Sequence, residues 1–167
     1  AAWVFTRAGG IWTQQGSKLV GTGAVSGING VRQGASVSLS ADGNTAIVGA
    51  WGDNSGAGAA WVFTRSGGVW TQQGSKLVGT GAVNSSNGAW QGYSVSVSSD
   101  GNTALVGGLF DNDFAGAAWV YTRIGSVWTQ QGNKLVGTGA VGTAEQGTSV
   151  SLSSDGNTAI VGGFADS

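Results

Sequence analysis

The chain has 167 residues, with seven Lys and Arg against eight Asp and Glu, and it contains no Cys, Met, Pro or His. The absence of Cys excludes disulfides and zinc–thiolate sites, and the absence of His removes the usual general base and the commonest transition-metal ligand. A net charge of −1 without a basic stretch argues against nucleic-acid binding.

Only 9% of the residues are charged, against about 25% in an average soluble domain, and Gly contributes 33 residues. The polarity comes from hydroxyl and amide side chains, which favours an extracellular or cell-surface bacterial protein. No apolar run reaches the roughly 18 residues of a membrane-spanning helix, so we expect no membrane insertion. Neither an initiator Met nor a signal peptide is visible, and we expect the chain to be a piece of a longer protein.

The sequence is dominated by an internal repeat. Residues 1–25, 59–83 and 117–141 align without gaps, and the second block differs from the first at two positions and from the third at four. Tryptophan recurs at a spacing of 58 residues, at Trp3, Trp61 and Trp119. An Asp-Gly-Asn sequence recurs at spacings of 58 and 55, beginning at Asp42, Asp100 and Asp155. Periods of this length are typical of solenoids, propellers and stacked arrays.

Two strands are predicted in the first half of a unit. Residues 36–40 alternate Ser with apolar or small residues, which is the period of a β-strand. Residues 42–44 read Asp-Gly-Asn, a tight-turn signal. Residues 45–49 form a short apolar run, as expected of a strand buried on both faces.

Two further strands are predicted in the second half. A Gly-, Asn- and Asp-containing loop leads to a third strand over residues 60–65, and Ser-Gly-Gly turns the chain again. A fourth strand begins over residues 69–73 and continues through a glycine bulge to residues 76–78. No segment has helical periodicity with caps, so we expect almost no helix.

Short turns between successive strands predict an antiparallel meander. A lone sheet of this size is marginally stable and must bury its faces against its own copies. We therefore predict an all-β fold, a β-propeller of four-stranded antiparallel blades in a single repeat domain over residues 1–167. The units are a half blade with strands three and four (1–32), a full blade (33–90), a second full blade (91–145) and a half blade with strands one and two (146–167).

The chain thus holds three blade-equivalents, with one blade split between its termini. Propellers typically have about four to eight blades, so three should not close a ring. Either several copies complete one another's split blades, or the chain belongs to a longer array. A β-trefoil or β-prism, which needs only three units, remains an alternative.

The motif order also resembles a known repeat. Gln33-Gly34-Ala35-Ser36-Val37, then Val48-Gly49-Ala50-Trp51, then Gly58-Ala59-Ala60-Trp61-Val62-Phe63 is similar to the FG-GAP repeat, and the order recurs in all three copies. The resemblance implies the β-propeller architecture of integrin α chains and of many bacterial surface proteins. Gln33 stands where the family has Phe.

Calcium is the one cofactor that the resemblance would allow. Some FG-GAP members bind it through an Asp-rich loop between the first two strands. Here that loop is only Asp-Gly-Asn, with one carboxylate and one amide, whereas calcium takes six to eight oxygen ligands. We therefore expect no cofactor and assign no metal ligands.

The connections between units differ among the copies, while the turns at the opposite end are nearly constant. Alternate connections of a meander lie at the same end, so the variable loops should share one face, as binding loops do; neutral drift is the alternative. The candidate ligand-binding residues are Trp90, Arg32, Asp53, Asn54, Asp111, Asn112 and Asp113. A loop tryptophan can stack on a sugar or pack on its own loop, and loop Asp and Asn can contact a polyol or a cation, or satisfy local backbone groups.

We expect no enzymatic activity, because no base is available to activate the plentiful Ser and Thr hydroxyls. The recurring strand tryptophans are assigned to the core, and the recurring lysines and arginines to pairing across neighbouring blades. The sequence favours a structural or adhesive module whose partners are other copies of itself or adjoining repeats. The alternative is a lectin-like propeller that binds a glycan through the variable loops.

Overall fold

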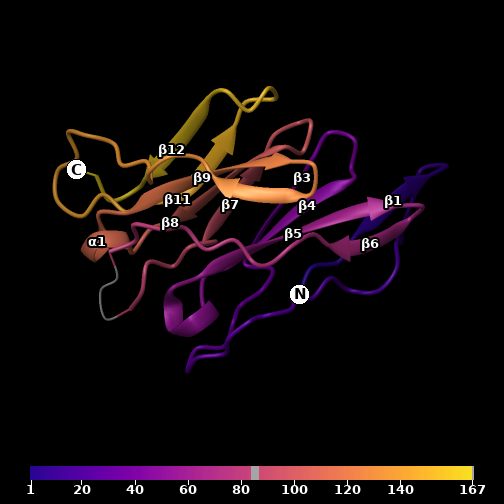
Figure 1. Cartoon of the computed structure of the whole chain (residues 1–167), viewed down its shortest axis with the longest axis horizontal. Coiled ribbons are helices and arrows are strands. Elements are labelled where there is room, and N and C mark those ends of the chain that lie inside the picture. The colour runs from indigo at the N-terminus through magenta and orange to yellow at the C-terminus, as the bar shows by residue number, and fades with distance from the viewer. Residues whose placement is uncertain (84–86, 167) are drawn as a thin grey trace.

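The structure is a computed structural model that describes residues 1–83 and 87–166. It is an all-β fold in which each sheet comes from one repeat unit (Figure 1). The half-unit sheets are β1 (Phe5–Ala8) with β2 (Ile11–Gln14), and β11 (Gln146–Leu152) with β12 (Ala159–Gly163). One full sheet contains β3 (Ser36–Leu39), β4 (Thr45–Ala50), β5 (Ala59–Ser66) and β6 (Val69–Gln72). The other contains β7 (Ser94–Val97), β8 (Thr103–Gly108), β9 (Ala117–Ile124) and β10 (Val127–Gln130).

The strands of each full sheet follow one another in chain order and are antiparallel, as the short turns predict. Val48 pairs with Trp61, and Val106 pairs with Trp119, so both full sheets have the same register. Each sheet pairs strands of one unit only, and the described residues join different units by isolated bridges, Gly58 with Gln91 and Gly116 with Gln146. A trefoil, in which strands of all three units share one barrel, is not compatible with this pairing.

The sheets lie one after another in chain order (Figure 1). The first strands of neighbouring units lie together, because Val97 N donates to Ser38 Oγ at 3.1 Å and Leu152 N donates to Ser96 Oγ at 3.0 Å. The half-unit sheets β1–β2 and β11–β12 lie on opposite sides of the two full sheets, so one face of each half-unit sheet has no neighbour among the described residues.

The core consists of apolar side chains between successive sheets. Between the two full sheets, Ile47 and Val62 of one pack with Val95, Val97 and Trp119 of the other. A second cluster lies between the first half-unit and the first full sheet, and includes Leu19, Val48, Trp61 and Phe63. Alternate residues of one strand therefore belong to different cores, which explains why β4 is buried along its whole length.

Two features differ from the expected elements. The fourth strand, β6, ends at Gln72 instead of continuing to residues 76–78. After it the chain pairs with β5 again only at Leu77, which forms an isolated bridge with Ala60. Single helical turns, which we did not expect, occupy the loop after the second strand, as η1 (Asp53–Gly56) and α1 (Asp111–Phe114). Neither is long or apolar enough to cross a membrane, and the described residues contain no helix that is.

Candidate functional site

One polar contact recurs wherever a unit passes to the next. The amide of Gln33 accepts from Gly21 N at 2.7 Å and donates to Gly21 O at 2.8 Å. Gln91 makes the same pair of contacts with Gly79, and Gln146 makes it with Gly137. The glutamine amide thus donates and accepts at the same backbone position, which ties each unit to the one before it.

The strand tryptophans are fixed by the unit that precedes them. Trp61 Nε1 donates to Thr22 O at 2.8 Å, and Trp119 Nε1 donates to Thr80 O at 2.9 Å. Both side chains are 0% exposed. The core role predicted for the strand tryptophans therefore holds at these two positions.

Two of the candidate ligand-binding carboxylates, those of Asp53 and Asp111, are buried and take part in the contacts between units. Asp53 is 0% exposed, accepts from Val25 N at 2.8 Å and forms an ion pair with Lys76. Asp111 is likewise buried and binds Val83 N and Lys134. Both oxygens of each carboxylate are used, so neither faces the surface where a ligand would bind.

The same contacts revise the role predicted for the recurring cations. Lys76 and Lys134 each pair within their own unit rather than across units. The arginines do cross, because Arg65 Nη1 donates to Gln15 Oε1 at 3.1 Å and Arg123 Nη1 donates to Gln73 Oε1 at 3.0 Å.

The other polar candidates are exposed, with Asn54 in one turn and Asn112 and Asp113 side by side in another. Asn54, Asn112 and Asp113 have φ values of 49°, 50° and 50° in the single helical turns. Asn is among the residues that best tolerate this left-handed region. The backbone N–H of Asn54 donates to Val25 O, and that of Asn112 donates to Val83 O. These residues shape the turns, and the described residues contain no group of three or more acidic side chains that could hold a metal.

The Asp-Gly-Asn turns are closed by their own side chains. Asp42 accepts from Ser40 Oγ at 2.6 Å, from Asn44 N at 2.9 Å and from Asn44 Nδ2 at 3.0 Å. The hydrogen bond from Ser40, followed by those from Asn44, lowers the pKa of Asp42 to about 2. The same bonds lower the pKa of Asp100 and of Asp155.

Trp90 belongs to a cluster of aromatic rings on the variable loops. Its indole stacks on Trp51 with ring centroids 4.2 Å apart and an interplanar angle of 25°. Phe110 contacts Trp90 edge-on at 4.0 Å, and Tyr93 lies 6.2 Å away. Phe114 contacts Phe110 at 4.4 Å. We call these five residues the aromatic cluster; none of them is fully buried.

Arg32 extends this cluster, since its guanidinium carbon lies 5.7 Å from the centre of the Trp51 ring. Of the seven candidate residues, Arg32 and Trp90 therefore meet at this cluster. They occupy equivalent positions, as does Glu145, and all three have a left-handed backbone with φ of 64°, 56° and 54°. The repeat keeps this backbone geometry and varies the side chain that it presents.

Four of the five cluster residues are departures from the repeat. The residues 58 positions before Trp90, Tyr93, Phe110 and Phe114 are Arg32, Ala35, Gly52 and Gly56. Phe114 has φ of 71°, a conformation that is unfavourable for a bulky residue. Strain of this kind persists where the surroundings enforce it, and it is concentrated at functional sites.

Sequence reasoning found Trp90 but missed Tyr93, Phe110 and Phe114. A signal was present, because a large aromatic residue replaces glycine or alanine at these positions of an otherwise faithful repeat. The convergence of three segments on Trp90 was not readable, since it depends on how two units pack.

Comparisons with known proteins add little to this picture. No family model matches the chain, and no curated protein matches it. Among solved structures, the chain is similar to the crystal structure of TolB from Acinetobacter baumannii, with a TM-score of 0.44 and 13% sequence identity. The match covers 91% of this chain and 29% of TolB, so the chain spans less than a third of that protein. Similarity at this level carries no argument about function.

Proposed function

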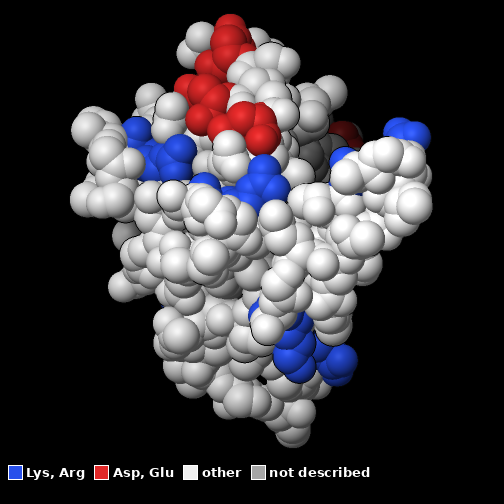
Figure 2. All heavy atoms as spheres, turned by 90° about the vertical axis from the view of Figure 1, so that its right-hand side faces the viewer, with Lys and Arg blue, Asp and Glu red and all other residues white. Residues whose placement is uncertain are grey.

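We propose that the chain is a non-catalytic β-propeller repeat module, structural or adhesive, of a secreted or cell-surface bacterial protein. The observation that carries this proposal is the repeated junction, in which a Gln amide, a Trp indole and an Asp carboxylate each bond to the backbone of the preceding unit. The recurring Gln, Trp, Asp and Lys side chains thus bind other groups of the fold. The FG-GAP resemblance and the sparsely charged face in Figure 2 agree with this role.

Duplicating one unit tests whether the chain is a modular repeat. A second copy of residues 33–90 inserted after residue 90 meets the same junction on both sides. We expect a folded, longer chain with a higher denaturant midpoint, because interior junctions increase while the open ends stay the same. Aggregation or loss of cooperative unfolding would overturn the modular interpretation.

The absence of catalysis can be tested directly. Chromogenic glycosides, esters and phosphate esters should show no turnover above a blank. Turnover that disappears in Asp53→Asn or Asp111→Asn would contradict the proposal, because it would give these buried carboxylates a chemical role.

A second candidate function is carbohydrate binding at the aromatic cluster. It is favoured by one observation, the partly exposed rings gathered where the second unit departs from the repeat. Rigid aromatic side chains provide a large apolar contact area with a polar edge, and Arg32 supplies hydrogen-bond donors beside them. We expect a glycan array to show binding that Trp90→Ala abolishes and Lys134→Arg leaves unchanged. No binding, with or without calcium, would eliminate this candidate.

A further inference from the structure

The two ends of the stacked sheets expose side chains that are buried at every interior junction. Trp3 is 55% exposed and Phe5 is 53% exposed, whereas their equivalents Trp61 and Phe63 are 0% and 4% exposed. At the other end, Ile160 is 71% exposed, whereas its equivalent Ile47 is 0% exposed. The exposed faces carry the same residues that form the core elsewhere.

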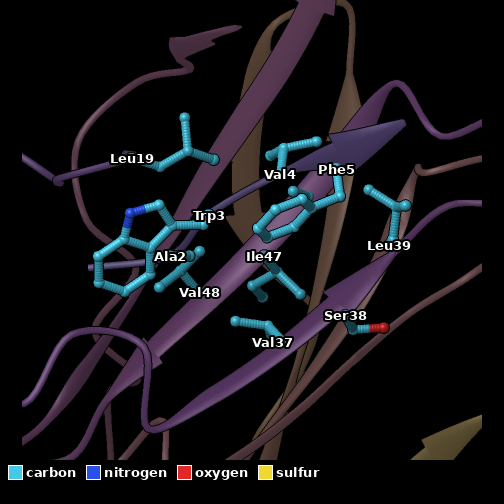
Figure 3. A pocket seen from close by; sticks show the side chains of 11 residues that line it. Ala2, Trp3, Val4, Phe5, Leu19, Val37, Ser38, Leu39, Ile47 and Val48 are labelled. Atoms are coloured by element: carbon cyan, nitrogen blue, oxygen red, sulfur yellow. The ribbon is translucent and has the colours of Figure 1, made fainter. Parts of the chain in front are cut away.

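The first of these faces contains an apolar cleft of about 260 Å³. Figure 3 shows Trp3, Val4 and Phe5 on one side of it and Val37 and Leu39 on the other. Val37 and Leu39 are 61% and 53% exposed, while the equivalent valines of the next unit are each 8% exposed because a first and second strand pack on them. The cleft lies where such a pair of strands is absent.

We propose that this cleft is filled by β11 and β12 of a second copy of the chain, so that two copies complete each other's split blade. The inference rests on the proposed repeat module and names its partner. Edge strand β12 of one copy would pair with the first residues of the other copy in the register of β4 with β5. Thr158 then faces Thr6, Ile160 faces Val4, and Gly163 faces Ala1 of the partner copy.

The side chains required at such a junction are present on both ends. Each interior tryptophan meets a glycine whose Cβ would lie about 2.1–2.2 Å from its indole, and bonds to the following threonine. The third copy of this glycine and threonine is Gly137–Thr138, and no tryptophan follows it in the sequence. Trp3 of a second copy supplies the missing indole.

The ion pair of the split blade is divided in the same way. Lys18 is the equivalent of Lys76, and Asp166 is the equivalent of Asp53. Asp166 already accepts from Val141 N, as Asp53 does from Val25 N, while Lys18 has no ion pair in residues 1–83 and 87–166. Joining two copies brings Lys18 of one to Asp166 of the other and restores the third Asp–Lys pair.

Light scattering tests the assembly on the unmodified chain. Two copies related by a twofold axis make two such junctions and leave no open end, so we expect twice the chain mass of 16.5 kDa. A mass of one copy overturns the proposal. A series of higher multiples overturns the closed pair in favour of an open chain of copies.

Cysteine pairs test the register, since the chain has no cysteine of its own. Thr45 and Thr64 are opposite each other in β4 and β5, and the neighbouring Arg65 N donates to Asn44 O. The threonines are therefore a non-hydrogen-bonded pair, the closer kind, with Cα atoms about 4.5 Å apart. Thr6→Cys with Thr158→Cys should oxidise to a covalent dimer on a non-reducing gel.

Two controls accompany this variant. Thr45→Cys with Thr64→Cys should oxidise within one chain, and Thr6→Cys with Ile160→Cys, which is two residues out of register, should not oxidise efficiently. If the internal pair oxidises and the Thr6–Thr158 pair stays monomeric, the junction between copies is refuted. A monomer that still unfolds cooperatively leaves the repeat-module proposal intact, so the two failures are distinguishable.

Charge reversal tests the side chains. Lys18→Glu should weaken dimerisation about tenfold or more, because it places a negative charge beside Asp166, whose equivalents Asp53 and Asp111 are buried at the interior units. Lys18→Arg should preserve the dimer. Equal dimerisation of both variants would show that this ion pair does not form.

Discussion

Trp3 and Trp119 lie in the same Ala-Ala-Trp-Val sequence, in the first and third copies of the repeat, but they differ in burial. Trp119 is completely buried and bonded to Thr80 O, whereas Trp3 is more than half exposed. Trp3 lies in a half-unit sheet with no preceding unit, whereas Trp119 lies in a full sheet that packs on the unit before it. Burial in this fold is therefore a property of the junction between units and not of the strand itself.

The largest expected effect comes from removing each tryptophan in turn. Trp119→Ala should lower the free energy of unfolding by about 3–5 kcal/mol, because it leaves a cavity in the core between the full sheets. Trp3→Ala should cost less than about 1 kcal/mol in the monomer, because much of that side chain already contacts water. Urea unfolding of both variants at concentrations that exclude association checks this, and equal losses would contradict the junction argument.

The glycine that faces each tryptophan also differs between the interior of the stack and its end. A Cβ at Gly79 would lie 2.1 Å from Trp119 Cδ1, whereas a Cβ at Gly137 would meet only the flexible Gln146 amide at 3.1 Å. Gly79→Ala should therefore cost about 1–3 kcal/mol through overpacking, and Gly137→Ala much less. Thermal unfolding of the two variants compares them directly.

If the chain dimerises, the expected effect of Gly137→Ala changes, whereas that of Gly79→Ala does not. Gly137 would then face Trp3 of the second copy, so Gly137→Ala should reduce dimerisation while leaving the monomer stable. A Gly137→Ala variant that dimerises normally would count against the assembled junction.

Local patterns were sufficient to predict the strands. Alternation over residues 36–40 and the Asp-Gly-Asn turn both act within a few residues, and the observed β3 and β4 follow them closely. The role of Asp53 was not readable, because its partners Val25 and Lys76 are distant in the sequence and converge only after the units pack. The aromatic cluster has the same origin, since it joins loops of two units.

At Tyr121 a substitution is expected to raise the stability of the chain rather than lower it. Its equivalent in the first full sheet is Phe63, and both are almost fully buried. Within residues 1–83 and 87–166 the Tyr121 hydroxyl has no hydrogen-bond partner, and burial raises the pKa of this group. Tyr121→Phe should therefore raise the free energy of unfolding by about 1 kcal/mol, since a buried unsatisfied polar group costs about 1–3 kcal/mol.

Denaturant midpoints of the wild type and Tyr121→Phe measure this gain. The reverse change, Phe63→Tyr, should destabilise the chain, because it would bury a hydroxyl in the other core. A loss of stability in Tyr121→Phe would indicate that the hydroxyl has a partner in solution.

The smallest expected effect is a pH dependence of stability that comes from the constant Asp-Gly-Asn turns. Hydrogen bonds from Ser40 and Asn44 lower the pKa of Asp42 to about 2, below the unperturbed value of 3.8. A group whose pKa is lower in the folded chain stabilises the fold above its unfolded pKa, and this contribution is lost as the pH falls through the folded value. Stability should therefore decline between about pH 4 and pH 2, by a small amount because these turns are exposed. Asp42→Asn should flatten the decline when midpoints at pH 5 and pH 2.5 are compared. An unchanged slope would contradict the assignment of this acid sensitivity to the carboxylates of the constant turns.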